Sequence, residues 1–149
     1  MQKPNWNTRV VVRRAPDQLT VYVRNHQFAV GAPLHFDHEY SEVTALEYVV
    51  GALSADLVGC LISAARRHRV HLENIEAAAS SELNNALTYL GVVGESGHPG
   101  LERVQITTYV RTSARAEDLN VIWEEVLERS PLVQTFKAAV SLDLQLRRL

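Results

Sequence analysis

The chain has 149 residues, of which 46% are hydrophobic and 21% charged, and its formal net charge is −2. This length and composition predict one soluble domain, residues 1–149, with a core of its own. The balanced charge provides no basic surface for nucleic acid or an anionic membrane, so neither is expected as a partner. The single cysteine, Cys60, excludes an intrachain disulfide and a cysteine-based zinc site, and it fits a reducing cytoplasm.

The first 40 residues predict three short strands, because β-branched runs alternate there with turn signals. These runs are residues 9–13, 19–24 and 27–30. A polar loop, residues 35–40, holds two histidines and two carboxylates; we expect a solvated loop there, with a metal site as the less favoured reading. Ser41 or Thr44 is then expected to start a long helix that ends near His68.

The stretch from residue 43 to residue 65 is the most apolar part of the chain. It approaches the length that spans a membrane, but Glu47, Asp56 and two glycines interrupt it. A buried central helix is therefore the better prediction.

The second half alternates between strand and helix patterns. We expect strands at 70–79, 103–111 and 140–147, an amphipathic helix at 117–129, and a short helix after Ser130-Pro131. The glycines between 91 and 100 predict a flexible hairpin tip, since the lysine and helix of a phosphate-binding loop are missing. The order of elements predicts an α+β protein. Because one thin sheet would leave much of the long helix uncovered, we expect a homodimer with residues 43–68 in its interface.

Several segments occur in the order and spacing of a known family. They are Leu46–Ala55 on the apolar helix, Leu72–Glu76, His98-Pro-Gly-Leu101, and Ser130-Pro-Leu132. In this respect the chain resembles the OsmC/Ohr family, thiol peroxidases that reduce organic hydroperoxides as intertwined homodimers. The resemblance implies an OsmC-like fold, with an antiparallel sheet and a long central helix.

The resemblance also places the two redox positions of the family. Its reactive cysteine follows Ala-Leu-x-x and precedes a strand isoleucine by 19 residues; here Asp56 follows Ala52-Leu-Ser-Ala and precedes Ile75 by 19. Its second cysteine, in a Cys-Pro-Val motif, matches Ser130. Asp56 and Ser130 would therefore replace both redox cysteines, and their side chains should lie close together in the fold.

Two further family features are less well matched. Glu47 aligns with an acidic residue of the family motif, although the functional glutamate of the Ohr-type enzymes lies one position earlier, at Leu46. The family's active-site arginine comes from the N-terminal strands, where Arg9, Arg13 and Arg24 are alternative candidates.

Each candidate residue also has a structural explanation. Cys60 lies one turn after Asp56, and both burial and a neighbouring carboxylate raise a thiol pKa, so a structural cysteine is favoured. Asp56 either pairs with an N-terminal arginine or serves a pocket as acid, base or ligand anchor. Ser130 before a proline is typical of a helix N-cap rather than a nucleophile.

Three functions follow from these residues. The first is a repurposed family member without peroxidase activity that binds a small hydrophobic molecule at the dimer interface, and the absence of both matched cysteines favours it. The second is a hydroperoxide reductase using Cys60 with an external thiol. The third, with least support, is an acid/base enzyme built on Asp56. None of the three requires a cofactor or a metal.

Overall fold

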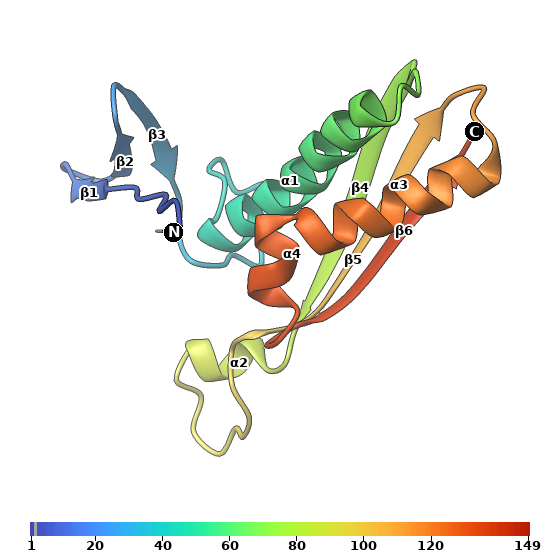
Figure 1. The fold of residues 1–149 in the computed structure, drawn as a ribbon. Coiled ribbons are helices and arrows are strands. Elements are labelled where there is room, and N and C mark those ends of the chain that lie inside the picture. Colours follow the sequence, from blue (N-terminus) through green and yellow to red (C-terminus); the bar gives the residue numbers. More distant parts are fainter. Residues whose placement is uncertain (2) are drawn as a thin grey trace. The chain divides into compact units, whose positions relative to one another are not determined.

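The computed structural model describes residues 1 and 3–149. The chain forms two compact units, residues 1–49 and residues 50–149. The long helix α1, Ala45–Arg67, begins in the first unit and continues in the second. Figure 1 labels the helices and strands along the chain.

The first unit contains an antiparallel sheet in the order β1-β2-β3. Its strands are Val10–Arg14, Leu19–Val23 and His26–Val30. Ala15 and Gln18 close the first turn through a backbone hydrogen bond of 3.1 Å. The second turn is tighter, since Val23 pairs with His26, and Arg24 adopts a positive φ of 53° there. The three predicted strands are thus confirmed to within one residue at either end.

Helix α1 begins with a capping box. Thr44 Oγ1 accepts a hydrogen bond from the Glu47 amide at 3.2 Å, and Glu47 Oε2 accepts one from the Thr44 amide at 2.8 Å. These reciprocal bonds satisfy backbone donors that a helix start leaves open. Of the two predicted start residues, Thr44 is therefore the cap.

The buried face of α1 has helical periodicity. It consists of Leu53, Leu57, Leu61, Ala64 and Ala65. Within residues 1 and 3–149, α1 is the single helix whose length and hydropathy would suit a membrane span. Its leucines instead join the hydrophobic core of the second unit. The prediction of a core helix is confirmed.

The second unit contains a sheet in the order β4-β5-β6. Its strands are Asn74–Leu83, Leu101–Arg111 and Ser141–Arg148. β4 and β5 are antiparallel, but β5 and β6 are parallel, so the expectation of an antiparallel sheet is wrong for this pair. The reason lies in the connection, because helices α3, Ala116–Arg129, and α4, Pro131–Phe136, separate β5 from β6. A crossover of that length allows parallel pairing.

The start of strand β4 and the connection from β4 to β5 differ from the prediction. Strand β4 begins at Asn74, and residues 70–73 precede it as non-strand chain. The connection from β4 to β5 contains a short helix, α2, Ala86–Tyr89, which the sequence reading missed. Asn85 caps it by accepting a hydrogen bond from the Leu87 amide at 3.0 Å. An asparagine before an apolar residue was the available signal.

Helices α1 and α3 lie side by side over one face of the β4-β5-β6 sheet (Figure 1). The core between them combines leucines of α1 with Val104 and Ile106 of β5 and Ile122 and Val126 of α3. Thr108 lies on the same buried face of β5, and its hydroxyl has no hydrogen-bond partner in the described part of the chain. Helix α4 follows α3 after one residue, Ser130, and this junction positions the candidate site.

Candidate functional site

The two residues matched to the redox cysteines are in direct contact. Ser130 Oγ donates a short hydrogen bond to Asp56 Oδ2, across 74 positions of sequence. The Leu132 amide donates a second bond to the same oxygen at 3.3 Å. The prediction that the Asp56 and Ser130 side chains lie close together is therefore confirmed.

Ser130 is also the N-cap of α4. Its Oγ accepts a hydrogen bond from the Val133 amide at 3.1 Å, and Pro131 occupies the first turn. The hydroxyl thus donates to Asp56 and accepts from Val133 at the same time, and the residue is 0% exposed. The N-cap prediction is confirmed. Because the Ser130 hydroxyl is buried and already makes two hydrogen bonds, it is poorly placed to attack a substrate.

Asp56 and Ser130 together satisfy two amides at the start of α4, those of Leu132 and Val133. A helix start leaves such N–H groups without intrahelical partners, and an anionic acceptor there is favourable. The carboxylate on α1 therefore fastens α4 to the central helix. We call this arrangement of Asp56, Ser130 and the two amides the α1–α4 clamp.

An open cleft of about 480 Å³ runs beside the clamp. It lies entirely within the second unit and is lined by Ala55, Asp56, Gly59, Cys60, Ser63, Arg67, Val126, Arg129 and Pro131. The α1 side of the cleft is made mainly of small residues, which leave room beside the helix. The Cys60 thiol is partly exposed there.

The surroundings of Cys60 disfavour its thiolate. Burial raises the pKa of the Cys60 thiol, and the nearby Asp56 carboxylate raises that pKa further, whereas Arg67 acts in the opposite direction. The net effect is a raised pKa, as the sequence reading expected. Since the thiolate is the nucleophile, this environment lowers the reactivity of Cys60.

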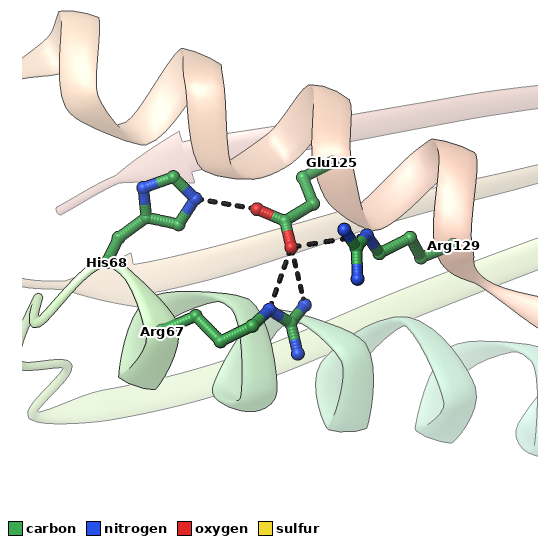
Figure 2. A network of polar contacts seen from close by, with 4 residues as sticks. All are labelled: Arg67, His68, Glu125 and Arg129. Atoms are coloured by element: carbon green, nitrogen blue, oxygen red, sulfur yellow. Dashed lines mark hydrogen bonds and ion pairs between the residues drawn. The ribbon is translucent and has the colours of Figure 1, made fainter.

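A polar network joins the end of α1 to α3 and includes two residues that line the cleft, Arg67 and Arg129 (Figure 2). Glu125 of α3 accepts from Arg67 Nε at 2.8 Å and contacts His68 Nε2 at 2.6 Å. Arg129 Nε lies 3.4 Å from the same carboxylate. Hydrogen bonds from His68 and Arg67 hold the pKa of Glu125 below its usual range.

Sequence reasoning missed this network. It assigned the basic residues after residue 65 to the dipole at the end of α1, which is only part of their role. The available signal was the pair Glu125 and Arg129, one turn apart on the predicted helix of residues 117–129. Which partner Glu125 would find on α1 depends on how the two helices pack.

Glu47 has a structural explanation. The two hydrogen bonds from Thr44 lower the pKa of the Glu47 carboxyl, and both belong to the cap of α1. Its alignment with an acidic family position therefore needs no catalytic role.

The three N-terminal arginines occupy different settings. Arg13 lies over the Tyr22 ring, with its guanidinium carbon 5.5 Å from the ring centre, and Arg24 forms the turn after β2. Arg9 directly precedes β1. Among residues 50–149, Asp56 forms no ion pair within 4.0 Å. An arginine of the N-terminal strands as its charge partner stays a prediction.

The loop of residues 35–40 is held by packing and local hydrogen bonds. The His35 ring stacks on Tyr40 with 4.0 Å between ring centres, and the Tyr40 hydroxyl accepts a hydrogen bond from the Ala32 amide at 3.0 Å. Within the described residues 1 and 3–149, no group of three or more histidine, cysteine or acidic side chains gathers as a metal site would require.

No protein-family model matches this sequence, and no curated protein matches it. Solved structures match along nearly the whole chain. An OsmC-like protein from Mycoplasma pneumoniae is 10% identical with a TM-score of 0.78, covering 99% of each chain. The organic hydroperoxide resistance protein OsmC of Legionella pneumophila is 12% identical with a TM-score of 0.71, covering 97% of this chain and 99% of that one.

A third structure, the organic hydroperoxide resistance protein OhrB of Bacillus subtilis, is 14% identical with a TM-score of 0.62. It matches 95% of this chain and 98% of its own. The class is therefore that of mixed α+β proteins built on a long central helix. More particularly, the chain has the OsmC/Ohr fold, which confirms the fold implied by the sequence resemblance.

Proposed function

We propose that this protein is an OsmC/Ohr-like cytoplasmic homodimer that has no thiol-peroxidase activity and binds a small hydrophobic molecule. The observation that carries the proposal is the α1–α4 clamp. The residues matched to the family's redox cysteines lie side by side, but they are an aspartate and a serine joined by a hydrogen bond.

Peroxide reduction needs a thiolate that attacks the O–O bond, becomes a sulfenic acid and releases an alcohol, followed by a second thiol that resolves it. Neither Asp56 nor Ser130 can pass through these states. Both are instead committed to fastening α4. The substitution thus exchanges a redox pair for a permanent structural contact.

Binding is supported by the cleft beside the clamp. Its volume of about 480 Å³ lies in the range of small-molecule sites. Ala55, Gly59, Val126 and Pro131 provide apolar surface, and a few polar groups stand at its edges. A pocket of this kind orients a ligand without chemistry.

A homodimer is supported by the apolar surface that α1 leaves uncovered. Ile62 is 42% exposed, and Gly51, which does not line the cleft, is exposed on the same helix. A second copy covering this helix would remove the surface from water.

The decisive experiment for the peroxidase question measures consumption of cumene hydroperoxide with dithiothreitol, comparing the natural chain with Cys60→Ala. We expect equal, near-background rates and slow oxidation of Cys60 by mass spectrometry. For the binding question, NMR titration with 1-octanol should shift resonances of residues lining the cleft. An absence of shifts would remove the binding half of the proposal while leaving the peroxidase half intact.

The alternative is a hydroperoxide reductase that uses Cys60 with an external thiol. The observation in its favour is that Cys60 lines the same cleft as Arg67, whose positive charge partly opposes the rise that burial and Asp56 cause in the thiol pKa. This alternative predicts rapid stoichiometric oxidation of Cys60 followed by dithiol-dependent turnover, both lost in Cys60→Ala.

A further inference from the structure

The cleft beside Asp56 and Cys60 has one strongly basic end. Arg67 comes from the last turn of α1 and Arg129 from the last turn of α3, and both line the cleft. Both guanidinium groups turn toward a single carboxylate, Glu125 (Figure 2). Two permanent cations therefore share one anion, which leaves one positive charge even with His68 neutral.

The two arginines also keep hydrogen-bond donors free. Arg67 uses Nε and one terminal nitrogen on Glu125, at 2.8 and 2.7 Å. Arg129 makes only the 3.4 Å ion pair, and among the described residues its guanidinium makes no hydrogen bond. Their side chains are 47% and 66% exposed, so the remaining N–H groups are accessible. A guanidinium presents five donors in a fixed plane, which suits a carboxylate.

The acidic residue of the cleft is separate from this end. Asp56 precedes Arg67 by 11 positions, which is roughly 16 Å along an α-helix. Its Oδ2 already accepts bonds from Ser130 and Leu132. Along α1, Gly59 and Ser63 lie between Asp56 and Arg67, and both line the cleft.

We infer that the ligand of this cleft is an amphiphilic monocarboxylate, whose carboxylate is bound by Arg67 and Arg129 and whose apolar chain lies along the small residues of α1. The inference rests on the proposed ligand-binding function and adds its chemical class. Arg129 provides the freer donors, whereas Arg67 both binds the ligand and stays paired with Glu125. The apolar surface accounts for affinity and the arginines account for selection of an acid.

The experiment compares octanoate with 1-octanol, which has the same chain length without the charge, by isothermal titration calorimetry at 50 mM salt. We expect octanoate to bind at least tenfold more tightly than octanol. Arg129→Gln should weaken octanoate about tenfold and leave octanol unchanged, and Arg67→Gln should act in the same direction. Arg115→Gln, at the opposite end of α3 and paired with Asp118, is the matched control and should change neither affinity.

Repeating the titration in Cys60→Ala separates binding from any thiol chemistry. Urea unfolding of each variant shows whether the fold is retained; Arg129→Gln is the main test because its contact with Glu125 is the longer one. Equal affinities for octanoate and octanol, or an Arg129→Gln variant that binds octanoate normally, would overturn the inference and leave the proposed function standing. Failure of both probes to bind would overturn the ligand-binding function itself.

Discussion

The hydrogen bonds of the α1–α4 clamp allow the loss of unfolding free energy in Asp56 variants to be predicted. Asp56→Ala removes the acceptor of the Ser130 hydroxyl and of the Leu132 amide. A hydrogen bond to a charged group contributes about 1.5–3 kcal/mol, and the 3.3 Å bond to Leu132 lies at the long end of the range. We therefore expect Asp56→Ala to lower the free energy of unfolding by about 2–3 kcal/mol. Asp56→Asn keeps an acceptor and should cost about half as much.

Ser130→Ala tests the same contact from the other side. It removes the N-cap bond to Val133, worth about 1 kcal/mol, together with the bond to Asp56. Because both single variants lose the shared hydrogen bond, their effects should not add. The double variant is expected to be more stable than the sum of the single losses by about 1–2 kcal/mol.

The assay is urea unfolding at pH 7, followed by circular dichroism, with all variants at one protein concentration because dimerisation would couple stability to concentration. Ser63→Ala is the matched control, since Ser63 is an exposed serine of α1 beside the same cleft. It should change stability by less than about 0.5 kcal/mol. Additivity of Asp56→Ala and Ser130→Ala within about 0.3 kcal/mol would refute the clamp.

Four further predictions follow from other features. Asp56→Cys with Ser130→Cys, in a Cys60→Ala background, should form a disulfide on mild oxidation, detected by non-reducing electrophoresis; the absence of a bridge would contradict the assignment of both redox positions. Sedimentation at micromolar concentration should show a dimer, and a monodisperse monomer would contradict the proposed cover of α1. Glu125→Gln should lower the free energy of unfolding at neutral pH, because a carboxyl whose pKa is lowered in the fold contributes stability above its ordinary pKa of 4.5. The difference in stability between the natural chain and the variant should shrink as the pH falls below 4.5. An equal loss at pH 3 and pH 7 would exclude this account. Thr108→Val should raise the free energy of unfolding by about 1 kcal/mol in urea titrations, since it replaces a buried hydroxyl without a partner, and a loss of that size would indicate an unrecognised hydrogen bond.

Local patterns in the sequence were sufficient to predict most of the secondary structure. The β-branched runs before residue 31, the apolar periodicity of α1 and the Ser130-Pro131 cap each depend on neighbours within a few positions, so each was readable from the chain. Helix α2 was missed because four residues produce almost no periodicity. The parallel pairing of β5 with β6 was missed because pairing direction depends on the path of the connecting helices.

In the candidate site, too, some features could be predicted from the sequence and others depended on the tertiary structure. The resemblance to the OsmC/Ohr family, aligned through the spacing from Asp56 to Ile75 and the Ser-Pro motif, predicted that Asp56 lies beside Ser130, and these residues are 74 positions apart. The capping box at Thr44 and Glu47 was present in the sequence as a local pattern, yet the acidic residue was assigned to a candidate catalytic role. A family alignment reports position, and only the hydrogen bonds show what the residue does there.

By itself the sequence determined the order of the longer elements and the position of the core helix, because these depend on residue type and spacing. Only the tertiary structure decided that Glu125 lies between Arg67 and Arg129, and that both arginines border a cleft with Cys60. The physical reason is that ion pairs form between whichever charged ends helix packing brings together. Helices α1 and α3 pack through leucine, isoleucine and valine, and that packing sets which charges meet at their edges.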